Sequence, residues 1–309
     1  MHPCCGEVQA LSELKIAIAT GPSGYVTVKS ILDASKQSGT SRLDWLEIGL
    51  AAAEADETLH DVGVGGLPDA LGRMSLDAAI MDGPSHRAGA VAGLLGFRSP
   101  IAVARRVMER TPHVMLVGEG AKRFAEAQGF SDEGALLTDY SRERYEAFLR
   151  GEVDLEATGD QHIDGGDTVG AIVMDTDDLL ACGTSTSGLA FKMPGRVGDS
   201  PIIGGGLYVE QGVGSAVCLG MGEQMMQVGM AMRTVTKLAQ GMSPQAAAEA
   251  AMRDMIRLRP SCLGTTCLVI ALNQEGDAGG ARTKEHPDFH YWQASPTGVI
   301  KVEAPVMGN

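Results

Sequence analysis

The feature that most constrains this sequence is an abrupt change of composition near its middle. Between Glu152 and Asp167 the chain is rich in Asp, Gly and Glu and has almost nothing to bury, whereas Thr168–Met174 reads Thr-Val-Gly-Ala-Ile-Val-Met. A segment with so few apolar side chains cannot contribute much to a core, so residues 152–167 are expected to form an exposed, mobile connection. The run that follows has the length and content of a buried strand. The chain therefore divides at residue 168.

The first half alternates between strands and helices, whereas the second half opens on several strands before its two helices, which predicts an α/β (α+β) fold. Strands placed centrally in each half, with helices outside them, predict two stacked sheets covered on both faces, a four-layer sandwich. The expected strands are 16–20, 76–81, 88–95, 114–117, 168–174, 179–184, 207–209, 215–219, 266–272, 289–292 and 299–302. The expected helices are 26–36, 43–55, 100–110, 121–128, 142–150, 223–240 and 244–259.

Two helices carry specific expectations. Ser99 is the predicted N-cap of the helix at 100–110, with Pro100 at its first position. The segment 223–240 has the clearest helical pattern and places Met225, Val228, Met232, Val235 and Ala239 on one face. Its methionines are interpreted as core filling rather than as a cofactor site.

Charge and composition exclude several functions. With 25 basic and 39 acidic residues the formal net charge is −14, which argues against a nucleic-acid partner. The sequence has no apolar run of the roughly 18 residues that a membrane span needs. The start of the chain lacks the pattern of a signal peptide, and six cysteines over 309 residues do not make a disulfide scaffold. A cytoplasmic protein with reduced thiols is expected.

No metal or cofactor motif is found. His286 and His290 are four apart, but Pro287 breaks the helix that would align them as metal ligands. The glycine-rich segments 63–66 and 204–206 lack the context of a phosphate-binding loop and are interpreted as turns. A G-x-S-x-G nucleophile motif is also absent, which argues against a serine esterase. The sequence therefore predicts no metal and no cofactor.

Thr168 itself offers a chemical possibility. If the Asp167–Thr168 bond breaks, Thr168 acquires a free α-amine beside its own hydroxyl. An α-amine has a pKa of roughly 7.7–8.0, so it can act as the general base for the Oγ nucleophile at neutral pH. The alternative is that Thr168 is only an ordinary strand residue, because Asp-Thr pairs are common.

Motifs along nearly the whole chain resemble the family of glycosylasparaginases (aspartylglucosaminidases) and plant-type asparaginases or isoaspartyl peptidases, which are N-terminal nucleophile (Ntn) hydrolases. The resemblance rests on Val62-Gly-Val-Gly-Gly66-Leu-Pro-Asp69, Leu76-Asp-Ala-Ala-Ile-Met-Asp-Gly83, Ile101-Ala-Val-Ala-Arg105, Leu116-Val-Gly-Glu119, Asp167-Thr-Val-Gly170, Gly183-Thr-Ser-Thr-Ser-Gly188, Gly195-Arg-Val-Gly-Asp-Ser-Pro201 and Gly220-Met-Gly-Glu223. It implies a single αββα domain made as an inactive precursor that cuts itself before a threonine. The α chain would be residues 1–167 and the β chain residues 168–309, assembled as a dimer of αβ units.

The resemblance also implies the site. Asp167–Thr168 would be the scissile bond, with Asp167 straining or polarising it and Thr168 becoming the nucleophile. Thr186 would hydrogen-bond near the Thr168 amine and hydroxyl. Arg196 matches the arginine that holds the substrate α-carboxylate, and Asp199 matches the aspartate that holds its α-ammonium group. The alternative for Arg196 and Asp199 is an ion pair within a turn.

Three departures from the family pattern concern the substrate pocket. The T-G-x-G oxyanion segment reads Leu219-Gly-Met-Gly222, so a hydroxyl is lost, although Gly220 keeps its backbone N–H. Asp61 stands where a serine precedes V-G-x-G-G, which brings a negative charge toward the pocket. The Trp-Pro near the glycosylasparaginase N-terminus is replaced by Gly21-Pro22-Ser23-Gly24.

The resulting prediction is a self-cleaving threonine amidohydrolase that acts on a small β-aspartyl-type amide: asparagine, an isoaspartyl dipeptide or a glycosylasparagine-like compound. Gly220, Gly222 and Asp61 are predicted to line its substrate site. One alternative keeps the fold and the nucleophile but takes a non-aspartyl amide, because Asp61 and Leu219 change the pocket. The other alternative is a poorly active pseudoenzyme with a binding role.

Overall fold

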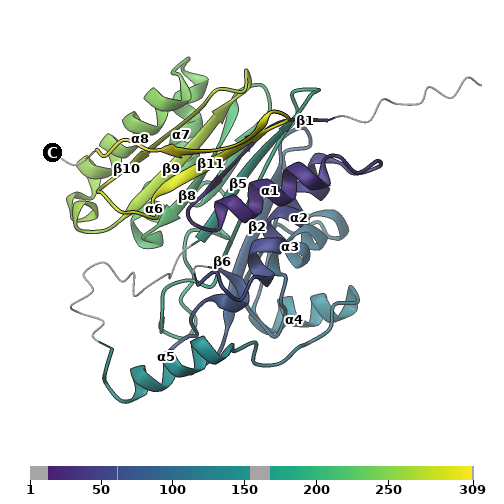
Figure 1. The fold of residues 1–309 in the computed structure, drawn as a ribbon, viewed down its shortest axis with the longest axis vertical. Coiled ribbons are helices and arrows are strands. Elements are labelled where there is room, and N and C mark those ends of the chain that lie inside the picture. Colours follow the sequence, from purple (N-terminus) through teal and green to yellow (C-terminus); the bar gives the residue numbers. More distant parts are fainter. Residues whose placement is uncertain (1–12, 61, 154–167, 308–309) are drawn as a thin grey trace, which may run out of the picture.

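The computed structural model describes residues 13–60, 62–153 and 168–307. Two sheets are stacked between layers of helices (Figure 1). One buried apolar cluster joins the larger sheet to its helices, a second fills the space between the sheets, and a third joins the smaller sheet to its helices. The predicted four-layer sandwich is therefore confirmed.

The larger sheet carries the strand that begins at Thr168. Its order is β12-β11-β1-β5-β6-β2-β3-β4, and only the β3–β4 pair is parallel among the strand pairs of the described chain. Strand β5 lies between β1 and β6 and is buried along its whole length. Its central place explains the continuous apolar run, since both faces of β5 are covered. The strands are β1 (Leu14–Thr20), β2 (Ser75–Asp82), β3 (Arg87–Leu95), β4 (Met115–Val117), β5 (Thr168–Asp175), β6 (Leu180–Thr186), β11 (His290–Ser295) and β12 (Gly298–Glu303).

The smaller sheet has the order β10-β9-β8-β7 and is antiparallel throughout. Its strands are β7 (Leu207–Glu210), β8 (Gly214–Gly220), β9 (Cys267–Asn273) and β10 (Ala278–Arg282). The sequence did not predict β10, which reads Ala-Gly-Gly-Ala-Arg and has no large apolar side chain. It forms as an edge strand because it pairs with β9 and packs against helix α8.

Helices cover the outer face of each sheet. Those on the larger sheet are α1 (Gly24–Ala34), α2 (Arg42–Ala55), α3 (Pro100–Arg110) and α4 (Gly118–Ala127), and those on the smaller sheet are α6 (Gly222–Val228), α7 (Met230–Ala239) and α8 (Pro244–Leu258). Helix α5 (Asp139–Leu149) lies apart from both layers in Figure 1, and its Phe148 ring stacks on Phe191. Short 3-10 turns occupy Gly63–Gly65 and Pro260–Gly264.

The single helix predicted over 223–240 is wrong. Gly229 has φ 61°, a left-handed conformation that ends α6 and starts α7 in a new direction. The break rotates the second part of the pattern, so Met232 is 51% exposed instead of facing the core. Met225, Val228 and Val235 are buried as predicted.

Ser99 precedes α3 as predicted but makes no side-chain cap. The N–H of Ile101 instead donates to a carboxyl oxygen of Glu54 in α2, at 3.0 Å. The Ser99 hydroxyl donates to the other oxygen of the same carboxyl group, at 2.8 Å. A side chain distant in sequence therefore caps this helix.

Candidate active site

Thr168 begins β5 in the middle of the larger sheet and is 5% exposed. In the strand register it lies opposite Thr186 of β6. The hydroxyl of Thr20, at the end of β1, donates to the Thr168 carbonyl at 3.5 Å and accepts the Gly170 N–H at 2.9 Å. These contacts with both neighbouring strands hold the Thr168 backbone in place.

The Thr168 side chain lines a recess with residues from four segments of the chain. We call this the Thr168 recess; it is lined by Thr168, Thr186, Gly188, Leu189, Arg196, Gly198, Asp199, Ser200 and Gly220. The structure thus brings together Thr168, Thr186, Arg196, Asp199 and Gly220, five of the residues that the sequence predicted for one site. Asp61 and Asp167 lie outside the described residues.

Ser200 is a contact of Thr168 that the sequence analysis missed. The two side-chain oxygens, Thr168 Oγ1 and Ser200 Oγ, are 3.2 Å apart, and Ser200 is 1% exposed. The Ser200 carbonyl accepts the Thr184 hydroxyl at 2.6 Å, which ties the segment to β6. Ser200 follows Asp199 within a motif already singled out, but sequence alone could not show which hydroxyl faces Thr168.

Thr186 and Leu219 differ in where the structure places them. The Thr186 hydroxyl accepts the Gly188 N–H at 2.8 Å and so shapes the turn after β6. A hydrogen bond from Thr186 to Thr168 stays a prediction. Leu219 is fully buried in the apolar cluster between the sheets. It adds no hydroxyl where the family pattern has one.

Arg196 is held by Glu223, the acidic residue in the first turn of α6. Its Nε and Nη2 atoms each lie 2.9 Å from one oxygen of the Glu223 carboxylate. The side chain of Arg196 is 14% exposed and that of Glu223 is 41% exposed. The sequence motif contained Glu223, but its pairing with Arg196 was not predicted.

Gly222 packs tightly between Arg196 and Asp199. A Cβ atom at Gly222 would lie 2.8 Å from the Asp199 backbone nitrogen and 2.9 Å from its Oδ1. It would also lie 3.1 Å from Arg196 Nη2. Only glycine fits here without a clash. Gly222 therefore does not line the recess as predicted, but it allows Arg196 and Asp199 to lie close together beside it.

A second pair of charges lies buried beside Arg196. Lys192 Nζ donates to the Ser75 carbonyl at 2.8 Å and lies 3.9 Å from Asp77 Oδ2. Burial lowers the pKa of Lys192 and raises that of Asp77, and each charge opposes the shift of the other. A Cβ added at Gly188 would lie 2.6 Å from Lys192 Nζ and 3.3 Å from Arg196 Nη1, so both cations approach the same glycine.

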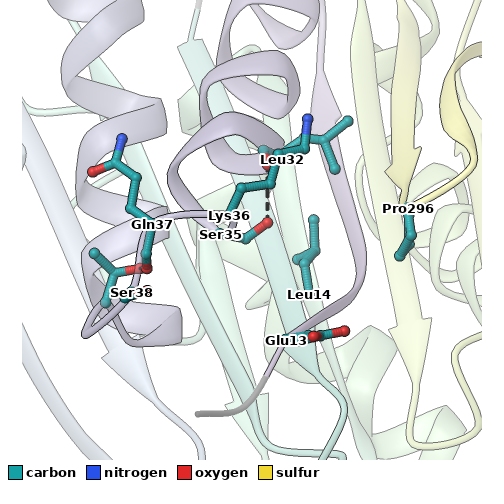
Figure 2. A pocket seen from close by; sticks show the side chains of 9 residues that line it. Glu13, Leu14, Leu32, Ser35, Lys36, Gln37, Ser38 and Pro296 are labelled. Carbon is teal, nitrogen blue, oxygen red and sulfur yellow. Dashed lines mark hydrogen bonds between the residues drawn. The ribbon is translucent and has the colours of Figure 1, made fainter.

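Other features of the described chain lie away from this site. A pocket at the far end of β1 is lined by residues including Leu14, Ser35 and Pro296 (Figure 2). Leu14 pairs with Asp175, at the opposite end of β5 from Thr168.

Within the described residues there is no cluster of three potential metal ligands among His, Cys, Asp and Glu. A search of the same residues finds no helix long and apolar enough to cross a membrane.

The chain has two sheets between helical layers, and the threonine that begins a central strand lines a recess with an arginine and an aspartate. These features define an amidohydrolase of the Ntn type. A family model described as asparaginase matches residues 26–300, and the chain belongs to that family.

Similar proteins that carry asparaginase names agree with this assignment. An N(4)-(beta-N-acetylglucosaminyl)-L-asparaginase of Elizabethkingia miricola is 41% identical over 245 residues, covering 78% of this chain and 71% of the relative. A plant-type L-asparaginase of Pyrococcus horikoshii is 36% identical over 275 residues, covering 86% of this chain and 87% of the relative. An N(4)-(beta-N-acetylglucosaminyl)-L-asparaginase of Rattus norvegicus is 36% identical over 270 residues, covering 79% and 77%.

Proposed function

We propose that this chain is a self-cleaving threonine amidohydrolase that acts on a small β-aspartyl-type amide. The observation that carries the proposal is that the Thr168 hydroxyl shares one recess with Arg196, Asp199 and Gly220. A nucleophile, a carboxylate-binding cation, an ammonium-binding anion and a backbone donor are what hydrolysis of such an amide requires.

The first proposed step is cleavage of the Asp167–Thr168 bond. Thr168 Oγ attacks the carbonyl carbon of residue 167, the C–N bond breaks, and an ester to Oγ forms. Water then hydrolyses the ester, which leaves a carboxylate on residue 167 and a free amine on Thr168. The products are chains of residues 1–167 and 168–309 within one domain.

The second proposed step uses the amine that the first has released. The amine accepts the Oγ proton while Oγ attacks the substrate amide carbon. The Gly220 N–H stabilises the oxyanion, and the protonated amine returns its proton to the leaving nitrogen. Water hydrolyses the acyl-enzyme ester and restores Thr168. Ser200, 3.2 Å from Oγ1, and Thr186, opposite in the sheet, orient the nucleophile.

Substrate recognition is proposed to rest on charge. A guanidinium presents paired N–H donors that match a carboxylate, which suits Arg196 to the substrate α-carboxylate. Asp199, 3% exposed, suits the α-ammonium group. The relatives named above are asparaginases and glycosylasparaginases, and we propose asparagine, isoaspartyl dipeptides and glycosylasparagine as the first substrates to assay.

We also propose that the cleaved protein is a cytoplasmic dimer of αβ units. The dimer follows from the family resemblance. The compartment is supported by Cys182, Cys218, Cys262 and Cys267, which are free and buried, as expected in a reducing environment.

The test compares wild type with Thr168→Ala and with Thr236→Ala, which changes an exposed threonine of α7. We expect wild type and Thr236→Ala to yield fragments of residues 1–167 and 168–309 by mass spectrometry and to hydrolyse asparagine. Thr168→Ala is expected to stay one chain and to be inactive. Two fragments from Thr168→Ala, or an intact wild-type chain after long incubation, would contradict the proposal.

A further inference from the structure

The guanidinium of Arg196 has two edges that can bind a carboxylate, and Glu223 binds one of them. Glu223 accepts from Nε and Nη2, at 2.9 Å each, and so occupies one edge of the planar group. A guanidinium has five N–H donors, so Nη1 and the second hydrogen of Nη2 remain on the adjacent edge. That edge can still hold a carboxylate by two parallel hydrogen bonds.

The remaining edge faces the Thr168 recess. A Cβ added at Gly198 would lie 2.9 Å from Nη1, and one added at Gly188 would lie 3.3 Å from it. Gly188 and Gly198 both line the recess, and neither has a side chain to cover Nη1. The edge held by Glu223 and the edge toward the recess are therefore different.

Glu223 is suited to this role because it is ionised and its carboxylate is anchored on a helix. Burial raises the pKa of Glu223, but the hydrogen bonds and charge of Arg196 outweigh burial and hold the pKa below its usual value. A flexible arginine loses rotamer freedom when it binds a ligand, and a group already held in place loses less.

We propose that Glu223 is the positioning residue for recognition of the substrate α-carboxylate. It fixes one edge of Arg196 so that the other is presented to the recess. This inference rests on the proposed role of Arg196 in binding that carboxylate. In the opposite arrangement, Glu223 would occupy the place that the substrate carboxylate needs. Removing the Glu223 charge would then strengthen binding of the carboxylate instead of weakening it.

The experiment measures ligand binding, which does not require turnover. L-Aspartate and β-alanine differ only in the α-carboxylate, and their dissociation constants are measured by calorimetry for wild type, Glu223→Gln and Glu249→Gln. Glu249 is a matched control, since it is a helix-surface glutamate that pairs with Arg253. Self-cleavage of each protein is checked on a denaturing gel, and folding by thermal melting.

We expect Glu223→Gln to bind L-aspartate about tenfold more weakly, within the range of a hydrogen bond to a charged group. Its affinity for β-alanine is expected to stay within twofold, and Glu249→Gln is expected to match wild type for both ligands. With asparagine as substrate, KM should rise while kcat changes little.

Three results would overturn the inference: unchanged or tighter aspartate binding by Glu223→Gln, equal weakening for both ligands, or a wild type that does not prefer aspartate over β-alanine. Glu223→Asp provides a check if Glu223→Gln folds poorly. It retains the charge on a shorter side chain, so it should weaken aspartate binding less than Glu223→Gln. A wild-type chain that fails to cleave is a different result, because it contradicts the proposed function whatever the binding shows.

Discussion

Replacing Glu54 by glutamine is expected to change how stability depends on pH. Glu54 lies in α2 and is fully buried. Its carboxyl group accepts hydrogen bonds from Ser185 Oγ at 2.6 Å, Ser99 Oγ at 2.8 Å and the Ile101 N–H at 3.0 Å. Burial raises the pKa of Glu54 to about 8, although these hydrogen bonds act to lower it. The folded chain therefore keeps Glu54 protonated at neutral pH.

The size of the effect follows from proton linkage. The unfolded chain has the ordinary glutamate pKa of 4.5, while the folded chain has about 8. Below pH 4.5 both states hold the proton and this group costs nothing. Between the two values only the folded state holds it, so the free energy of unfolding falls by about 1.4 kcal/mol per pH unit. The full loss, reached as pH passes 8, is about 5 kcal/mol.

Glutamine removes the titration and keeps an acceptor for Ile101 N–H. The assay is urea unfolding of Glu54→Gln and its parent at pH 5, 6, 7 and 8, both carrying Thr168→Ala so that a single chain unfolds reversibly. Other titrating groups are common to both proteins. We expect the stability of Glu54→Gln relative to its parent to increase by about 1.4 kcal/mol per pH unit. A difference that is constant across this range would refute the reasoning.

Two further predictions concern Thr168 and its surroundings. Ser200→Ala should slow self-cleavage and lower kcat about two- to tenfold with little change in KM, because one neutral hydrogen bond to the nucleophile is lost. Cleavage and turnover assays check this, and full activity of Ser200→Ala would count against the role of Ser200. Lys192→Met should destabilise the fold by about 3–5 kcal/mol in urea unfolding, because Asp77 is left buried without its cation. The double variant Lys192→Met/Asp77→Asn should recover most of that stability. An equal loss of stability in the double variant would show that Asp77 is not the cause.

Helices and strands were predictable from the sequence where the local pattern and the tertiary environment agree. Strand β5 was predictable because both of its faces are buried, and α8 because Ser243 accepts the Ala246 N–H and Pro244 starts the helix. An element was not predictable where a contact distant in sequence decides whether it forms or how it is capped. Strand β10 depends on β9 and α8, and the N-terminus of α3 is capped by Glu54 rather than by Ser99.

The sequence by itself predicted the change of composition before residue 168 and the two-sheet sandwich, and its family motifs predicted five of the residues that line the recess, since composition and motifs are properties of contiguous segments. Only the tertiary structure decided which groups face each other there. Ser200 turns its hydroxyl to Thr168, and Glu223 takes one edge of Arg196 from 27 residues away. The direction of a side chain depends on how separate segments pack, and packing is set by the whole fold. The same reason applies to Leu219. In the sequence motif it replaces a threonine hydroxyl, whereas in the structure its side chain packs in the core between the sheets.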